Sequence, residues 1–101
     1  MILLTIRMKV LPEKRLELSQ TIGSLCGFIR MEPGCRGCNF FQSLEDESRL
    51  FLLEEWDAEE SLITHLQSEH FRVFRGAMNL LEEPYESAFY TVSDPAGIGK
   101  I

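Results

Sequence analysis

One histidine and one tryptophan stand out as candidates for chemistry. Trp56 is the only tryptophan of the chain, and it falls at the end of a predicted strand. His65 lies three residues after Leu62 and one before Leu66, on the flank of the apolar stripe of the next predicted helix. An imidazole between a helix and a sheet, with an ordinary pKa of about 6.5, is suited to proton transfer. The alternative is a partly exposed helix histidine that is hydrogen-bonded or solvated.

Familiar motifs for metal, phosphate or nucleophile chemistry do not appear. His65 and His70 are five residues apart, which does not place them on one helical face, and no cysteine or aspartate completes a zinc set with them. The sequence contains no GxxxxGK[ST], GxGxxG or GxSxG pattern. We therefore predict that the protein binds no metal and needs no cofactor.

Two close-set pairs of reactive residues have structural interpretations. Cys35 and Cys38 form a single CxxC that enters a strand, where regular pairing points them to opposite faces, so we interpret them as two small strand residues. Glu54 and Glu55 also point to opposite faces of their strand. They cannot act as an acid/base pair across one substrate.

Composition limits the possible partners. The 101 residues fit one domain, 1–101, with 92–101 as a loose tail. Sixteen acidic against ten basic residues give a net charge of −6, which argues against nucleic acid and against anionic membrane surfaces. No apolar run approaches the roughly 18 residues of a membrane span. The cysteine count of three is odd, and we expect a reducing, cytoplasmic setting.

The periodicity predicts six main elements. Apolar residues alternate over 1–10, 36–45, 49–57 and 85–93, which predicts strands, and they recur at helical spacing over 12–31. A second helical region is predicted as two pieces joined near Gln67. Asp57, with Glu60 three residues later, is the expected N-cap of the first piece, and Ser68 is that of the second.

The order strand, helix, strand, strand, helix, strand is the α+β, ferredoxin-like βαββαβ pattern. It predicts a four-stranded antiparallel sheet with both helices on one face. The third strand is nevertheless apolar on both faces, with Leu52 and Trp56 on one and Phe51 and Leu53 on the other. Because the helices can cover only one face, we predict a homodimer closed sheet against sheet. The alternative is that the outer apolar residues are scattered singles.

Two segments resemble the antibiotic biosynthesis monooxygenase family. One runs from 51 to 57 as FLLEEWD and continues through Leu62, His65–Leu66, Ser68 and His70–Phe71, in the pattern E-x-W…L…H-L-x-S-x-H-F. The other is Pro33-Gly34-Cys35, entering the second strand. The resemblance covers about 90 residues and implies a dimeric α/β barrel. Members include cofactor-free oxygenases of quinols and polyketide phenols, and haem-degrading monooxygenases.

The resemblance implies a set of roles in this chain. His65 is the candidate base, Trp56 supplies an indole N–H and a stacking wall, and Arg75 supplies positive charge beside the developing superoxide. Haem cleavage is disfavoured because Ile6 and Arg75 stand where haem-degrading members carry Asn and His. The substrate pocket would be lined by Leu62, Phe71, Phe74 and Met78.

We therefore predict a cofactor-independent monooxygenase that oxidises a small quinol-like or phenolic substrate with O2. Two alternatives use the same scaffold. One is a catalytically silent dimer that binds a small molecule. The other is an isomerase that uses His65 for proton transfer without O2.

Overall fold

The computed structural model describes residues 1–93. Within these residues the chain forms four strands, three α-helices and two short 3-10 helices, η1 and η2. In chain order the elements are β1 (Ile2–Lys9), η1 (Pro12–Lys14), α1 (Arg15–Ile29), β2 (Cys35–Gln42), β3 (Arg49–Trp56), α2 (Glu59–Leu66), α3 (Glu69–Ala77), η2 (Met78–Leu80) and β4 (Glu86–Thr91).

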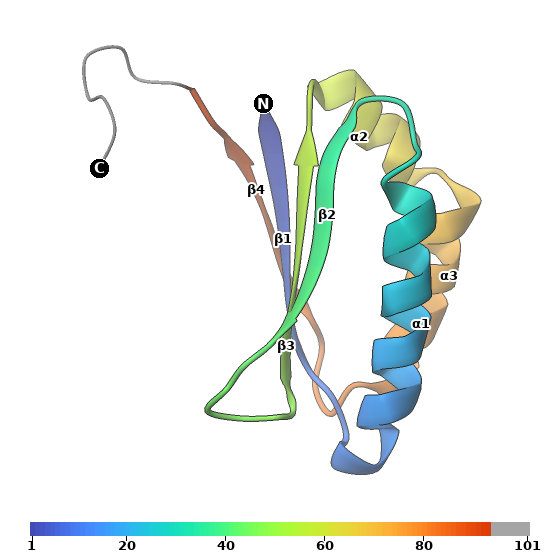
Figure 1. Ribbon diagram of the computed structural model, residues 1–101, viewed down its shortest axis with the longest axis vertical. Coiled ribbons are helices and arrows are strands. Elements are labelled where there is room, and N and C mark those ends of the chain that lie inside the picture. The colour runs from blue at the N-terminus through green and yellow to red at the C-terminus, as the bar shows by residue number, and fades with distance from the viewer. Residues whose placement is uncertain (94–101) are drawn as a thin grey trace.

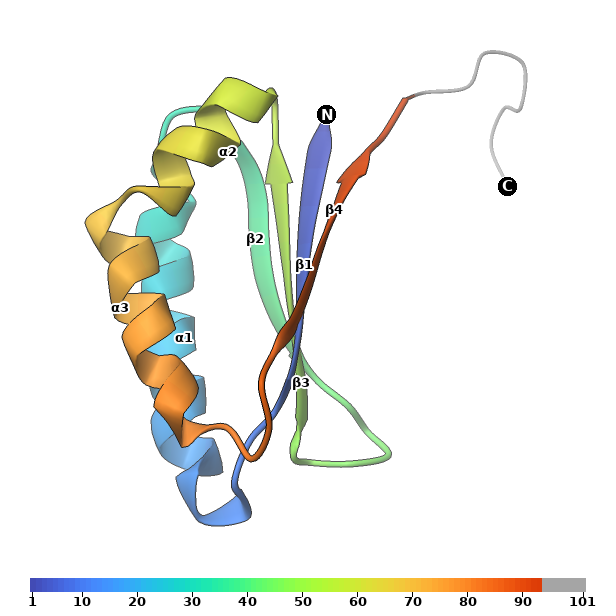
Figure 2. The same cartoon turned by 180° about the vertical axis from the view of Figure 1, so that it is seen from behind.

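The four strands form one antiparallel sheet in the order β2-β3-β1-β4, and all three α-helices lie against the same face (Figures 1 and 2). This arrangement confirms the predicted ferredoxin-like fold. The face under the helices is called the covered face below, and the other the open face. The structure is that of a single chain, so pairing of two open faces stays a prediction.

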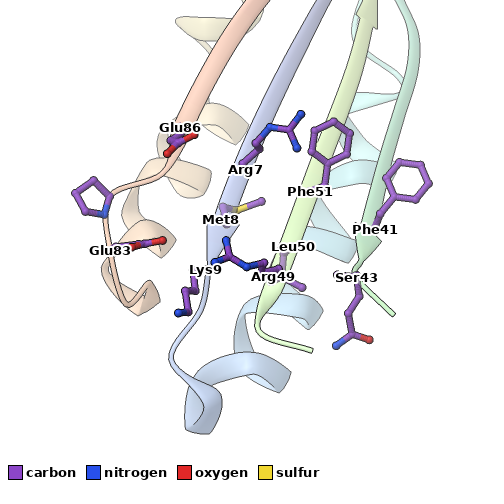
Figure 3. A pocket seen from close by; sticks show the side chains of 12 residues that line it. Arg7, Met8, Lys9, Phe41, Ser43, Arg49, Leu50, Phe51, Glu83 and Glu86 are labelled. Carbon is purple, nitrogen blue, oxygen red and sulfur yellow. The ribbon is translucent and has the colours of Figure 1, made fainter. Parts of the chain in front are cut away.

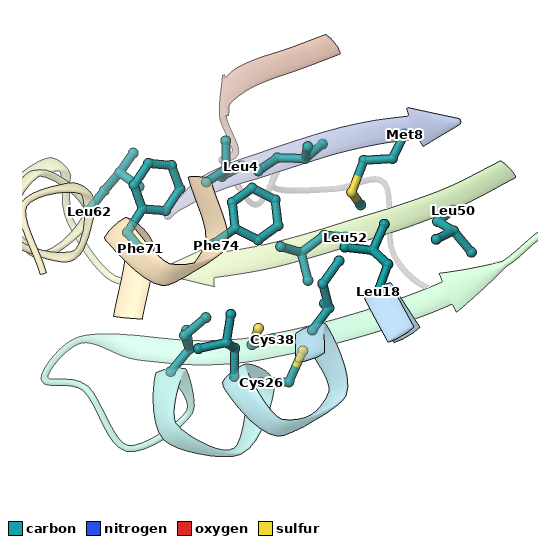
Figure 4. Packing of buried hydrophobic residues seen from close by; sticks show 14 of the residues in the cluster. Leu4, Met8, Leu18, Cys26, Cys38, Leu50, Leu52, Leu62, Phe71 and Phe74 are labelled. Carbon is teal, nitrogen blue, oxygen red and sulfur yellow. The ribbon is translucent and has the colours of Figure 1, made fainter. Parts of the chain in front are cut away.

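Alternation along the strands builds the core on the covered face. Leu4, Ile6 and Met8 of β1 are buried beside Leu50 and Leu52 of β3. The helices cover this layer with apolar stripes of their own, as the packing view shows (Figure 4). The stripe on α1 consists of Leu18, Ile22, Leu25 and Ile29. Buried apolar residues thus alternate along the strands and recur at helical spacing on α1, as the sequence predicted.

The break between α2 and α3 falls at the predicted place, but only one of the two predicted caps is present. The Ser68 hydroxyl accepts a hydrogen bond from the Phe71 backbone N–H at 3.2 Å, which confirms Ser68 as an N-cap. The prediction of Asp57 as the cap of α2 is wrong, because the N-cap position is Ala58. The Asp57 carboxylate instead accepts from the Ser61 hydroxyl at 2.6 Å.

A β-bulge changes the expected orientation of the two cysteines. The pairing register shifts between Cys35 and Gly37, so that Cys35 lies opposite Trp56 and Cys38 lies opposite Glu54. The expectation of opposite faces assumed regular pairing. The extra residue at the bulge turns both side chains to the covered face.

The last strand is shorter than the predicted 85–93, because β4 ends at Thr91. Most of the predicted tail, 94–101, lies outside the described residues. No helix within residues 1–93 is long and apolar enough to cross a membrane.

Candidate functional site

Three fully buried side chains form the centre of the candidate site between β3 and α2. The Trp56 indole N–H donates to Glu54 Oε1 at 3.0 Å. The rings of Trp56 and His65 stack with their centroids 4.6 Å apart. Nε2 of His65 lies 3.0 Å from the same Glu54 oxygen. Because successive residues of a strand alternate faces, Glu54 and Trp56 point together toward the helix that carries His65.

A second carboxylate approaches His65 from the other side. Nδ1 of His65 is 3.1 Å from both oxygens of Glu32, which lies in the turn after α1. Oε2 of Glu32 is also 3.7 Å from Nδ1 of His70, and the His70 ring stacks on Phe28 at 5.1 Å. The turn continues through Gly34, which has a φ of +83°. A side chain there would collide with Ser61 and Asp57, so glycine is required at this position.

The two carboxylates control the charge of His65. Burial alone would lower its pKa, since a buried imidazolium loses its hydration. The contacts and negative charges of Glu54, and then of Glu32, outweigh burial and raise the pKa of His65 above its ordinary value. The environment of His65 therefore favours imidazolium.

The contact between His65 and Glu54 is close but poorly aligned. Although Nε2 and Oε1 are 3.0 Å apart, Nε2 has no hydrogen-bond partner of good geometry within residues 1–93. The second oxygen of Glu54, Oε2, is also buried and unpartnered there. A buried polar atom without a partner normally costs free energy, and such atoms concentrate at functional sites.

The other predicted site residues lie around this centre. The Phe71 ring meets His65 edge-on at 5.4 Å and stacks on Phe74 at 5.6 Å. The exposed Arg75 places its guanidinium 5.4 Å from the same Phe71 ring, so Phe71 contacts both cation and imidazole. Met78 packs against the core, partly buried.

A pocket of about 400 Å³ lies beside this cluster, between α2 and the adjoining β1 and β4 strands. Among the predicted pocket residues it includes only Leu62, which lies one helical turn before His65 on α2. We call it the α2–β4 pocket. It is lined by Ile2, Glu59, Leu62, Ile63, Leu66, Phe89, Tyr90 and Thr91.

A second pocket, of about 350 Å³, lies on the open face near the β2–β3 turn (Figure 3). Its basic residues include Arg7, whose guanidinium lies 5.1 Å above the Phe51 ring. Phe51 in turn lies 6.2 Å from the Phe41 ring. Basic and aromatic groups thus meet on the face that the helices leave uncovered.

Two carboxylates and a phenol of this region were not predicted from the sequence. Glu54 shares a face with Trp56, and that spacing of two was the available signal for a buried carboxylate in need of a partner. Glu32 reaches His65 across 33 positions of sequence, and no local pattern marks such a contact. Tyr90 borders the α2–β4 pocket from an edge strand, but it pairs with Leu3, so its ring lies on the open face.

Within residues 1–93, no group of three or more His, Cys, Asp or Glu side chains is arranged to hold a metal ion. His65 and His70 both contact Glu32, but they do so as ionic neighbours of one carboxylate.

The four-stranded sheet under a helical layer, with a buried histidine against β3, defines a ferredoxin-like α+β protein. Residues 1–77 match the family model of antibiotic biosynthesis monooxygenase, and the chain belongs to that family. A Bacillus subtilis protein named "Putative monooxygenase YcnE" is 34% identical over 74 residues, which are 73% of this chain and 78% of that protein.

Solved structures share the fold of this chain. A conserved protein from Methanosarcina mazei superposes with a TM-score of 0.84 at 33% identity, over 88% of this chain and 89% of that one. The structure of Rv0793 from Mycobacterium tuberculosis gives a TM-score of 0.84 at 23% identity, over 95% of this chain and 98% of that one. At this lower identity the likeness concerns the fold alone.

Proposed function

We propose that the protein is a cofactor-independent monooxygenase that oxidises a small quinol-like or phenolic substrate with O2. The observation that carries the proposal is the pairing of two features across α2. One is the buried Trp56–Glu54–His65 cluster, and the other is the apolar α2–β4 pocket next to it. Leu62 belongs both to the buried core that contains Trp56 and to the wall of the pocket, so the two features share a residue.

The lining of the α2–β4 pocket suits a small aromatic ring. Its volume of about 400 Å³ falls in the usual range for ligand sites. Leucine, isoleucine and phenylalanine side chains form most of the wall, and Thr91 and Glu59 supply a few polar groups. An apolar site with few polar groups binds a phenol or quinol better than a highly charged substrate.

The chemistry asked of the site needs no external reductant. When a phenol becomes a quinone, one atom of O2 enters the ring and the other leaves as water, so the substrate supplies all the electrons. The protein must accept the phenolic proton and favour the resulting anion. The carboxylate–imidazole unit of Glu54, His65 and Glu32 can exchange protons as a whole, and imidazolium favours a nearby anion.

The predicted roles are adjusted by this geometry. His65 acts within the carboxylate–imidazole unit rather than as a free base, because its raised pKa favours the protonated form. Trp56 already donates its N–H to Glu54, so its role is to orient that carboxylate and to stack on His65. Arg75 supplies positive charge from the far, exposed end of the aromatic cluster, with Phe71, Phe74 and Met78 as its apolar packing.

We propose further that the protein acts as a homodimer through the open face. The support is the apolar surface on that face. It includes Phe41, which is 49% exposed, and Tyr90, which is 52% exposed. A second copy is the simplest cover for such a face, because a two-fold axis pairs the same patch with itself.

The test is oxygen uptake by the metal-stripped protein with a panel of hydroquinones and phenols. Wild type should consume O2 faster than a protein-free control for autoxidation. Ile63→Trp should abolish the excess, because Ile63 lines the pocket and the larger ring fills it. Val73→Trp is the matched control. It lies on the next helix at nearly the same exposure, 44% against 46%, and lines neither of the two pockets described above.

Other outcomes identify the alternative functions. Turnover that continues without oxygen would indicate a proton-transfer isomerase. Thermal stabilisation by the same compounds without turnover would indicate a binding module. Equal loss of uptake in Ile63→Trp and Val73→Trp would contradict the assignment of substrate to the α2–β4 pocket.

A further inference from the structure

A chain of four ionisable side chains runs from the buried centre of the protein to its surface. It begins at Glu54 on β3, passes through His65 on α2 and Glu32 in the turn after α1, and ends at His70 on α3. We call this set the carboxylate–imidazole chain. The four residues come from separate segments of the fold, so only the tertiary structure aligns them.

The separations are short at two of the three links, although the Glu54–His65 contact must realign before a proton can pass along it. Glu54 Oε1 and His65 Nε2 are 3.0 Å apart, and His65 Nδ1 is 3.1 Å from Glu32. Glu32 Oε2 and His70 Nδ1 are 3.7 Å apart, a distance that a small side-chain motion would shorten to a hydrogen bond. Carboxylates and imidazoles alternate along the whole chain. Each neighbouring pair therefore combines a possible donor with an acceptor.

Exposure rises toward one end. The side chains of Glu54 and His65 are 1% and 0% exposed, that of Glu32 is 15% exposed, and that of His70 is 38% exposed. His70 is also held in place by its stack on Phe28. The chain therefore has one end in water and one end in the core. At the core end Glu54 Oε2 is buried and has no hydrogen-bond partner among residues 1–93.

We propose that Glu54, His65, Glu32 and His70 form a path for protons between solvent and the buried centre of the protein, with His70 as its surface end. An imidazole that gains a proton at one nitrogen releases another from its second nitrogen, and a carboxylate does the same with its two oxygens. One proton enters at His70 for each one that leaves at Glu54, so no group is oxidised or reduced. His70 and Glu32 act through His65, as positioning and relay groups.

Other charged or titratable groups surround the chain and belong in any account of its pH dependence. From the α1 side, the Arg30 guanidinium binds the carbonyl of Cys38. From β2, the thiols of Cys35 and Cys38 lie near Glu54. Burial raises the pKa of Cys35, whereas a hydrogen bond with Cys26 of α1, followed by burial, raises the pKa of Cys38. From α3, Arg75 faces the Phe71 ring.

The use of this path in turnover rests on the monooxygenase function proposed above, but its existence can be tested without substrate. The measurement is the exchange of the His65 Nδ1 proton with water, followed by NMR on ¹⁵N-histidine-labelled protein. A positioned acid or base typically accelerates proton transfer about 100-fold or more, so His70→Gln should slow this exchange by about that factor. Glu32→Gln, which keeps the side-chain shape, should slow it as well.

Arg72→Gln is the matched control. It removes a charge from the same helix, at a residue whose side chain is 75% exposed and paired with Glu69 rather than with the chain. Thermal unfolding of each variant verifies that it is folded. Exchange in His70→Gln that is as fast as in wild type, or faster, would overturn the proposal, because the chain would then be a structural ion network only.

The oxygenase assay separates this result from the proposed function. If wild type consumes O2 and His70→Gln loses both fast exchange and turnover at low buffer concentration, the path serves the reaction. A small base such as free imidazole should then restore turnover by replacing His70 at the surface. If His70→Gln loses fast exchange but wild type shows no turnover, the proposed proton path is supported and only the proposed function is contradicted.

Discussion

The two faces of the sheet differ in which side chains they bury and which they expose. On the covered face, two ionisable side chains of fully buried residues, Glu54 and His65, contact each other in the core. On the open face, large apolar side chains such as Phe41 are left in water beside basic groups such as Arg7 (Figure 3). In a simple two-layer protein, ionisable side chains lie on the open face and large apolar side chains lie on the covered face.

This difference separates two kinds of function. Burying a charge is costly, and a protein that keeps an ion pair in its core gains positioning or chemistry rather than stability. Exposed apolar surface costs little inside one chain but favours association with a partner. The covered face therefore holds the chemistry that we propose, and the open face holds the surface through which we propose that two copies meet.

The largest effect is expected from removing the buried carboxylate. Glu54→Gln keeps the shape and still accepts from the Trp56 N–H, but it leaves His65 with one charge partner fewer in the core. Breaking a buried ion pair typically costs about 3–5 kcal/mol in the free energy of unfolding. Urea denaturation monitored by Trp56 fluorescence measures this loss.

Glu55→Gln is the matched control, one residue along the same strand. Glu55 points to the open face, opposite Leu3, and is only partly buried. A surface change of this kind is worth no more than about 0.5 kcal/mol. Equal losses in the two variants would mean that the two faces do not differ in the way described.

Adding a charge to the open face should disrupt the proposed dimer. Phe41→Asp is expected to convert the dimer, with twice the 11.6 kDa mass of the chain, into a monomer, because a carboxylate buried in a sheet–sheet interface has no partner. Light scattering coupled to size exclusion measures the mass. Val73→Asp, at similar exposure on α3, should leave the dimer intact. A wild-type mass of 11.6 kDa would contradict the dimer itself.

The sequence predicted the faces better than it predicted the contacts. A period of two placed Glu54 and Trp56 on one face and Phe51 on the other, because local backbone geometry alone decides that alternation. The contact between Glu32 and His65 depends on how the turn after α1 lies over α2, which no local pattern encodes. The bulge after Cys35 was missed for a similar reason, since it depends on the neighbouring strand.

A pH dependence should report on the covered face alone. The pKa of His65 is raised in the folded protein, so its contribution to stability is complete below about pH 6.5 and is lost as the pH rises through the raised value. The free energy of unfolding in urea should therefore fall as the pH increases over that window. Glu32→Gln should flatten this dependence, because it removes one of the charges that raise the pKa.

Glu69→Gln controls for a general effect of charge on the helices. Glu69 lies on α3 with its side chain 71% exposed, and it pairs with Arg72. Its removal should leave the slope of stability against pH unchanged. A slope as steep in Glu32→Gln as in wild type would mean that another group carries the titration.

The smallest effect is expected at the N-cap of α3. Ser68 caps α3 between the helix carrying His65 and the one carrying His70, and its hydroxyl accepts from the Phe71 N–H. Ser68→Ala should lower the free energy of unfolding by about 1 kcal/mol, the usual value of a cap. Ser24→Ala, on the exposed side of α1, should change it by less than about 0.5 kcal/mol. If the cap also aligns the carboxylate–imidazole chain, Ser68→Ala should speed or slow His65 proton exchange, whereas Ser24→Ala should not.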